Sequence, residues 1–230
     1  MFGDANDPLE QARKTSAAQA NILLNQSISQ CHKCPRLAFS VCRSGGCSDS
    51  GAAHAKLLVI GETMQEQSIG NVLFHAMDGS QGYDLLQRIW QELGVSSDQI
   101  FYINAVNCAG KQTPNPSEIK NCREHLDYCF RMLNPLAAIL MGPMAMNAYW
   151  PDQSFHDVKG SILDLWGIPA LVTYHPQHIY DFADLYGESG SQNLILELKN
   201  SLATCLQSIR SHPKAVSLFF EGGKKKDVCI

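Results

Sequence analysis

The amino-acid sequence predicts an α/β fold, a three-layer αβα arrangement with a central four-stranded parallel sheet. Short apolar segments alternate along the chain with longer segments whose apolar residues recur at helical spacing, a pattern typical of parallel strands joined by covering helices. Gly or Pro closely follows most of the short segments, as at Gly61, Gly142 and Pro176, where a strand would end. Of the 230 residues, 45% are apolar and 17% are charged, which supplies a sizeable core.

The elements follow from these patterns in chain order. Ser117 is a candidate N-cap for the third helix, with Glu118 in its first turn, where the helix dipole favours an anion. The stretch 155–168 has no clear periodicity, and we expect it to be irregular. The predicted strands cover residues 56–60, 100–105, 137–141 and 170–173, and the predicted helices cover residues 8–30, 82–93, 117–133, 144–149 and 191–209.

The chain is expected to form one catalytic domain at residues 31–210, with a helical extension at 1–30 and a basic tail at 211–230. No apolar run approaches the ~20 residues that a membrane-spanning helix needs, and the first ten residues are polar, unlike a signal peptide. The nine cysteines are odd in number and unevenly spaced, which argues for reduced thiols or metal ligands. We expect an intracellular, cytoplasmic monomer that does not enter a membrane.

Residue types that bind ligands gather where the predicted strands end. Residues 100–108 read I-F-Y-I-N-A-V-N-C, so a buried strand turns polar at Asn104 and reaches Cys108 four residues later. Parallel sheets bind ligands outside the carboxyl ends of their strands, where Asn104 would meet Gly61 and His175. An amide offers a donor and an acceptor side by side, which suits the edge of a planar ligand.

The C-x-x-C spacing of Cys31 and Cys34 lets two thiolates bind one metal centre. Two sets of partners remain open from the residues alone. One set is close in sequence and would complete a four-cysteine zinc site. The other lies at a strand end and on the following helix, an arrangement that suits an iron–sulfur cluster. The two sets are Cys42 with Cys47, and Cys108 with Cys122.

The net charge of −4 is unfavourable for a nucleic-acid-binding protein, because Lys and Arg contacts to phosphate supply most non-specific affinity. A local basic patch can compensate. The candidates for such a patch are Lys33, Arg36, Arg43, Lys111, Lys120 and Arg123.

Several short motifs occur in a fixed order along the chain. They are C-H-K-C-P at 31–35, L-V-I-G-E at 58–62, Phe74 with G-S-Q-G-Y-D-L-L at 79–86, Y-I-N-A-V-N-C at 102–108, S-E-I-K-N-C at 117–122 and T-Y-H-P at 173–176. This ordered set resembles the family 4, iron–sulfur uracil-DNA glycosylases of the uracil-DNA glycosylase-like superfamily. The resemblance runs from about Cys31 to the last predicted helix.

The resemblance implies a DNA glycosylase that excises uracil, or a related deaminated base, in base excision repair. Such an enzyme flips the base out of the stack and hydrolyses its N-glycosidic bond, so its partner would be DNA containing uracil. The resemblance also favours a 4Fe–4S cluster over zinc as the cofactor. The implied cluster ligands are Cys31, Cys34, Cys108 and Cys122.

The resemblance further implies a substrate pocket. In it, the backbone after Gly61 lines the pocket, uracil stacks on Phe74, Asn104 reads the Watson–Crick edge, and His175 donates a hydrogen bond to a uracil carbonyl. These four residues are the predicted substrate-binding residues.

The predicted catalytic residues are His175, Glu62 and Glu66. Glu62 occupies the second position of the family's first motif, and Glu66 is the nearest acidic residue after it. The family's usual G-E-A-P-G is replaced here by G-E-T-M-Q-E-Q at 61–67, so the loop near the sugar is expected to differ in shape. The alternative expectation is a catalytically weak or inactive relative that serves as a DNA-binding or assembly subunit.

Overall fold

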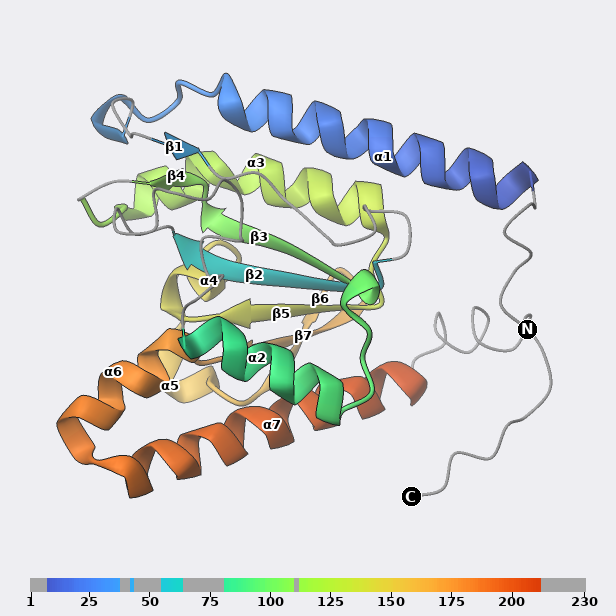
Figure 1. Cartoon of the computed structure of the whole chain (residues 1–230). Helices are drawn as coiled ribbons and strands as arrows, with labels where there is room; N and C mark the ends of the chain where they lie inside the picture. The colour runs from blue at the N-terminus through green and yellow to red at the C-terminus, as the bar shows by residue number, and fades with distance from the viewer. Residues whose placement is uncertain (1–7, 38–41, 44–54, 64–80, 110–111, 212–230) are drawn as a thin grey trace.

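The computed structural model describes residues 8–37, 42–43, 55–63, 81–109 and 112–211 of the chain. In these segments a central sheet lies between two layers of helices (Figure 1), which confirms the predicted three-layer α/β fold. Within the same segments, no helix is long and apolar enough to cross a membrane.

The central sheet has five strands in the order β3-β2-β5-β7-β6. The first four are parallel and correspond to the four predicted strands, whereas β6 pairs antiparallel with β7. The prediction of a four-stranded, wholly parallel sheet is therefore wrong by one edge strand. The strands are β2 (Leu57–Thr63), β3 (Ile100–Val106), β5 (Ala137–Met141), β6 (Ile162–Leu165) and β7 (Ile168–Thr173).

Strand β6 lies in the stretch predicted to be irregular. It joins β7 through Trp166 and Gly167, whose φ angles are +54° and +79°. Positive φ at both central residues is the mark of a tight hairpin turn, which usually carries Asn or Asp before Gly. A Trp in this position gives no turn signal in the sequence. The short helix α5 (Phe155–Val158) also lies in this stretch, and its four residues are too few to show a period.

The two faces of the sheet bury two apolar cores. Figure 1 shows α1 and α3 over one face and α2, α6 and α7 over the other. Residues of β3 alternate between them, so that Ile103 belongs to the first core and Tyr102 to the second. Strands buried on both faces read as nearly continuous apolar runs, which is why the sequence reveals them. The helices are α1 (Pro8–Ser29), α2 (Gln81–Glu92), α3 (Pro116–Leu133), α6 (Pro176–Tyr186) and α7 (Glu188–Ser211).

Helix α3 is capped by Asn115 and not by the predicted Ser117. The Asn115 side chain accepts from the Glu118 N–H at 3.0 Å, and the Glu118 carboxylate accepts from the Asn115 N–H at 2.8 Å, which is a reciprocal capping box. Pro116 occupies the first helical position, where its missing N–H costs no hydrogen bond. The Ser117 hydroxyl instead donates to Asn115 Oδ1.

Four further elements shape the edge of the sheet where the parallel strands end. Helix α4 (Pro143–Asn147) follows β5, and α6, which the sequence pattern did not indicate, follows β7 directly. In the segment predicted as loop, β1 (Cys42–Arg43) pairs antiparallel with β4 (Cys108–Ala109). The pairing fixes the chain after the C-x-x-C motif beside the end of β3. Two short 3-10 helices, at Pro35–Leu37 and Ser97–Gln99, complete the described elements.

Candidate functional site

The carboxyl ends of the four parallel strands meet at one edge of the sheet. The chain passes from β2 to β3 on one side and then returns to β5 on the other side of β2, so the strand order reverses between β2 and β5. Ligands of such sheets bind in the crevice at this switch point. Gly61 of β2 lies in register with Asn104 of β3, Gly142 follows β5, and His175 follows β7. The structure therefore places these predicted segments at a common edge.

Asn104 is buried, with 6% of its surface exposed, on the sheet face covered by α2. Strand alternation puts its side chain on the same face as Tyr102. The Tyr102 ring packs edge-on against Tyr83 of α2 at 6.5 Å between centroids, and its hydroxyl accepts from Gln87 Nε2 at 3.3 Å. Helix α2 thus forms a wall beside the Asn104 amide, which has a donor and an acceptor with which to read a planar ligand.

His175 lies between the end of β7 and the start of α6 and has a defined tautomer. Its Nδ1 accepts from the Gln177 N–H at 3.3 Å, so in the neutral ring the proton sits on Nε2. Burial lowers the pKa of His175 to about 3, with repulsion by His178 as the second cause. At neutral pH the side chain is therefore an uncharged imidazole whose Nε2–H is a hydrogen-bond donor.

The first turn of α2 packs directly on the backbone after His175. A Cβ at Gly82 would lie 2.6 Å from the backbone nitrogen of Gln177, closer than real Cβ contacts come. The Gly82 N–H also donates to Gln177 Oε1 at 3.3 Å. Glycine at this position lets α2 and the start of α6 touch, so that the α2 face carrying Tyr83 and the His175 turn belong to one rigid arrangement.

Glu62 occupies the switch point itself. Its Oε1 accepts from the Met144 N–H at 3.0 Å, and its Oε2 lies 3.5 Å from His178 Nε2. The side chain is only 15% exposed. Burial raises the pKa of the Glu62 carboxyl, whereas the Met144 N–H and His178 act to lower it. The carboxylate of this predicted catalytic residue is thus fixed in place by two partners.

Some of the predicted residues lie outside the described segments, and for them the predictions remain untested. They are Phe74, Glu66, Cys47 and Lys111. For Cys42 and Arg43 only the backbone is described, as strand β1.

The four cysteines of the second predicted set line one hollow of the structure. Cys31 and Cys34 come from the loop after α1, Cys108 from β4, and Cys122 from α3. All four are free thiols. Lys33, Leu37, Val106 and Asn121 complete the lining.

Amide N–H groups point at two of these sulfurs. The Cys122 Sγ accepts from the backbone N–H of Asn107 at 3.4 Å and from Asn107 Nδ2 at 3.5 Å, and the Cys34 Sγ accepts from Asn121 Nδ2 at 3.7 Å. Burial raises the pKa of Cys122 to about 12 and also raises the pKa of Cys34. N–H donors favour the thiolate form that metals bind, so they oppose the effect of burial.

The donor set is compatible with an iron–sulfur cluster, because thiolates are the ligands of such clusters. Among the described residues, no group of three His, Cys, Asp or Glu side chains is placed to hold a single metal ion. In a 4Fe–4S cluster each of four cysteines binds a different iron, so the thiolates surround a volume and do not converge on a point. Four free thiols around one hollow, with N–H donors behind two of them, fit such a group.

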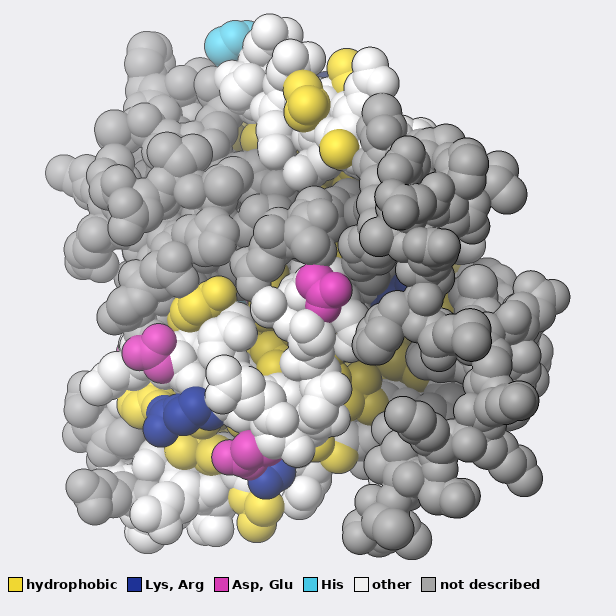
Figure 2. All heavy atoms as spheres, turned by 45° about the vertical axis from the view of Figure 1, so that its right-hand side comes forward, with side chains coloured by type: hydrophobic (Ala, Val, Ile, Leu, Met, Phe, Trp, Pro, Cys, Tyr) yellow, Lys and Arg dark blue, Asp and Glu magenta, His cyan; other side chains and the backbone are white. Residues whose placement is uncertain are grey.

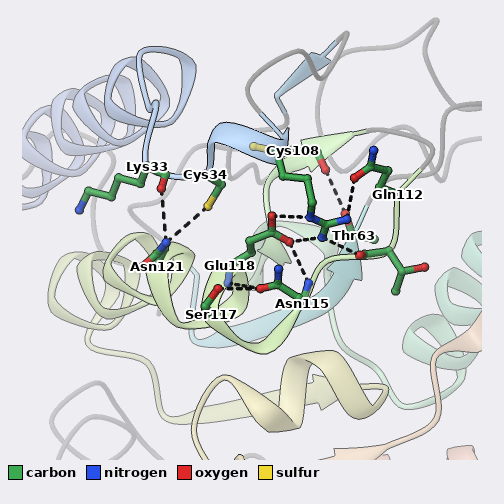
Figure 3. A network of polar contacts seen from close by, with 11 residues as sticks. Lys33, Cys34, Thr63, Cys108, Gln112, Asn115, Ser117, Glu118 and Asn121 are labelled. Carbon is green, nitrogen blue, oxygen red and sulfur yellow. Dashed lines mark hydrogen bonds and ion pairs between the residues drawn. The ribbon is translucent and has the colours of Figure 1, made fainter.

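Arg36 connects the two cysteine-bearing segments through Glu118, which Figure 3 shows beside its capping partner Asn115. Its Nε donates to Glu118 Oε1 at 3.0 Å, its Nη2 contacts Glu118 Oε2 and donates to the Thr113 carbonyl at 2.9 Å, and its Nη1 donates to Gln112 Oε1 at 2.6 Å. Glu118 is 4% exposed and also caps α3. Arg36 therefore joins the C-x-x-C loop to the start of the helix that carries Cys122.

Most of the described residues of the predicted basic patch are paired with acidic side chains. Arg36 is held by four hydrogen bonds and is not free to reach phosphate. The pairs of Lys33 and Arg123 are more exposed, and exposed ion pairs are weak in water and exchange readily. Lys120 is exposed. On the face in Figure 2, the described Lys and Arg side chains are scattered among acidic and apolar ones. The pairs are Lys33–Glu124, Arg36–Glu118 and Arg123–Asp127.

Several residues of the site cannot be recognised from the amino-acid sequence alone. Asn107 and Asn121 each precede a predicted cysteine ligand, which is a cue of proximity but not of N–H donation. His178 lies three residues after His175, one helical turn on, yet only the start of α6 at Pro176 makes that spacing meaningful.

The geometry agrees with a comparison against known families. A family model described as Uracil DNA glycosylase superfamily matches residues 48–186, more than half of the chain. The matched segment contains Glu62, Asn104, His175, Cys108 and Cys122. A search of curated proteins found no match.

Proposed function

The chain belongs to the uracil DNA glycosylase superfamily, and we propose that it is a DNA glycosylase of the family 4 type that excises uracil, or a related deaminated base, from DNA. The observation that carries the proposal is the neutral His175, whose Nε2–H donor stands at the same sheet edge as the buried Asn104. Together these groups offer a base one donor beside its carbonyl oxygen and one amide for its Watson–Crick edge.

The reaction would begin with the target base turned out of the DNA stack, because its glycosidic bond is inaccessible inside a duplex. Asn104 would then hold the base edge through its amide oxygen and nitrogen. Thymine differs from uracil by one methyl group at C5, so whether the pocket accepts thymine depends on which residue lies against C5. Phe74 is the predicted stacking partner on the face of the base.

Cleavage breaks the bond between C1′ of the sugar and N1 of uracil, and both bonding electrons leave with the base. Negative charge develops on a uracil carbonyl oxygen, where the His175 Nε2–H would stabilise it. A neutral imidazole can take this role, because its Nε2–H is a hydrogen-bond donor when Nδ1 is the acceptor. Removing one such donor typically costs about 10²–10³ in rate.

Positive charge develops on the sugar as the base departs, and a water molecule then adds at C1′ and loses a proton. Glu62 is the described acidic residue at the switch point, and its carboxylate would stabilise the sugar cation or accept that proton. The Met144 N–H fixes its position. Glu66 is the second predicted candidate for this role.

The test is a strand-scission assay. The pure protein is incubated with a single-stranded oligonucleotide containing one uracil, or with the same oligonucleotide containing thymine, and then treated with alkali. We expect scission only at uracil, with Asn104→Ala and His175→Ala each slowing it about 100-fold or more. Two exposed residues give matched controls, Asn200→Ala and His156→Ala, which should cleave at the wild-type rate.

A failure of scission at high enzyme concentration would contradict the proposal and favour a relative without glycosylase activity. Undiminished scission in both the Asn104→Ala and the His175→Ala proteins would mean that the pocket lies elsewhere.

We also propose that Cys31, Cys34, Cys108 and Cys122 hold a 4Fe–4S cluster. The four free thiols around one hollow and the N–H donors to Cys122 and Cys34 support this ligand set. Bound there, the group would crosslink the loop after α1, strand β4 and helix α3 through iron–thiolate bonds. Cys108 follows Asn104 by four residues, so the loop that would hold the metal and the base pocket keep a fixed separation.

The cofactor can be identified from the purified protein. We expect an orange-brown colour, absorbance near about 400 nm, and equal amounts of iron and acid-labile sulfide that fall when Cys122 is changed to Ala. A colourless protein containing zinc would instead favour the site made of Cys31, Cys34, Cys42 and Cys47.

A further inference from the structure

His178 lies beside both Glu62 and His175, the two residues that act on the sugar and on the base in the proposed mechanism. Its Nε2 is 3.5 Å from Glu62 Oε2, and its ring centroid is 5.7 Å from that of His175. The His178 backbone N–H donates to the His175 carbonyl at 3.0 Å, which sets the first turn of α6. One helical turn therefore fixes both distances at once.

Among the described groups that contact the Glu62 carboxyl, His178 is the one whose charge can change. Gly142 and the Met144 N–H contact the carboxyl group from the β5–α4 side. A backbone N–H does not titrate, so this contact does not change with pH. His178 approaches from α6 and is 41% exposed in its side chain, against 15% for Glu62. Among the described residues that contact Glu62, His178 is therefore a titratable group that connects the buried carboxylate with solvent.

The charges facing His178 act in a consistent way. Glu62 faces it from β2 and His175 from the end of β7, and on its own helix Asp181 accepts from Gln177 Nε2 at 3.4 Å. A proton on His178 favours the anionic form of Glu62 and disfavours a proton on His175. Both are the states that glycosidic cleavage needs.

We propose that His178 is a positioning residue for base excision, which pairs with Glu62 and keeps that carboxylate ionised and aimed at the reacting sugar. The inference rests on the proposed function. It assigns a role to a residue outside the motifs that relate the chain to its family, beside Glu62, after which the first motif departs from the family's usual sequence.

The first test is the pH dependence of single-turnover uracil excision. His178→Ala should lower the maximal rate about tenfold and leave the half-saturating enzyme concentration within twofold of wild type. Because His178 acts to lower the pKa of Glu62, its loss should move the acid limb of the profile to higher pH. His178→Arg places a positive charge at this position and should prevent that move, and His156→Ala should behave as wild type.

The second test does not depend on activity. Protein labelled with ¹³C at the glutamate carboxyl carbons is titrated by NMR, and the Glu62 signal is assigned from its absence in Glu62→Gln. We expect the Glu62 titration to move to higher pH in His178→Ala and to stay in place in His156→Ala.

The outcomes separate the two proposals. If the wild-type protein does not cleave uracil but the Glu62 titration moves in His178→Ala, the glycosylase proposal fails and the Glu62–His178 pairing stands. An unchanged Glu62 titration in His178→Ala overturns the positioning role. So does a His178→Ala protein that cleaves with the wild-type pH profile, or one in which only the half-saturating concentration changes, since that would place His178 in contact with DNA.

Discussion

The carboxyl group of Glu62 occupies the space where any side chain at position 142 would begin. A Cβ built on Gly142 would lie 2.4 Å from Glu62 Cδ and 2.7 Å from its Oε1. Gly142 also has a φ of +96°, a conformation that residues with a Cβ rarely adopt. The end of β5 is therefore shaped around the end of β2, and the acidic group of the site depends on the absence of a methyl group.

Gly142→Ala should abolish most of the activity with a modest loss of stability. The atoms that must move belong to the Glu62 side chain, and a misplacement of about 1 Å in a catalytic group can cost about 100-fold in rate. Gly94→Ala is the matched control, because Gly94 has a φ of +69° and open space where its Cβ would stand. Both changes should lower the free energy of unfolding by about 1–2 kcal/mol, measured by urea denaturation, and only the first should slow uracil excision. Equal rates in the two variants would show that Glu62 can move without consequence.

Asn107→Leu should weaken the metal centre without unfolding the domain. The change removes the Asn107 Nδ2–H···S contact to Cys122 and keeps the backbone contact. It also removes Asn107 Oδ1, a buried oxygen that has no hydrogen-bond partner among the described residues and is costly to bury. We expect iron to be lost to a chelator several-fold faster than from wild type, followed as the decay of absorbance near about 400 nm. Asn121→Leu removes an exposed donor to Cys34 and should have the smaller effect; the reverse order would argue against a role for burial.

The Arg36–Glu118 pair should show strong coupling in a double-mutant cycle. Arg36→Met alone leaves a buried carboxylate without its cation, which is costlier than removing both charges. We therefore expect the double variant Arg36→Met, Glu118→Gln to unfold at higher urea concentration than Arg36→Met alone, and to retain more iron. The exposed pair Lys199–Glu92 provides the control, because Lys199→Met should leave the urea midpoint nearly unchanged. Additive effects in the Arg36–Glu118 cycle would contradict the coupling.

Folding stability should rise with pH between about 3 and 6.5, in part because of His175. Burial lowers the pKa of His175 to about 3 in the folded protein, whereas an unfolded chain has the ordinary value of about 6.5. In this window the unfolded state binds more protons at this residue, so stability falls as the pH is lowered and levels off above about 6.5. The slope approaches about 1.4 kcal/mol per pH unit at most, and partial exposure of the ring reduces it. His175→Gln should flatten the curve of unfolding free energy against pH, whereas His156→Gln should not.

The sequence predicts the parallel part of the fold because its strands are buried on both faces. The runs at 100–105 and 137–141 are apolar at nearly every position, and no other element of a small α/β domain has that composition. The edge strand β6 escapes detection for the opposite reason. It is short and half exposed, with burial changing along its length, and its turn uses Trp166 where a recognisable hairpin would carry Asn or Asp.

The candidate site shows the same division, between residues that the sequence reveals and contacts that it does not. Asn104, His175, Cys108 and the pair Cys31 and Cys34 stand at positions that a strand end or a C-x-x-C spacing makes visible, whereas the residues alone leave Cys122 as one of several candidate ligands. The partners that give those residues their chemistry are distant along the chain. Arg36 reaches Glu118 across 82 positions and Glu62 reaches Met144 across 82 positions, and nothing in either local sequence specifies the other.

By itself, the sequence determined which segments form the four parallel strands, and that an amide near the end of one strand lies four residues before a thiol. These features depend on local composition and on the fixed geometry of an extended chain. Only the tertiary structure decided that Glu62 lies on Gly142 and faces His178, and that two asparagines donate to cysteine sulfurs. Such contacts depend on strand order and helix placement, which bring together groups from separate elements. The physical reason is that charge and hydrogen bonding act over a few ångströms in space, whatever the distance along the chain.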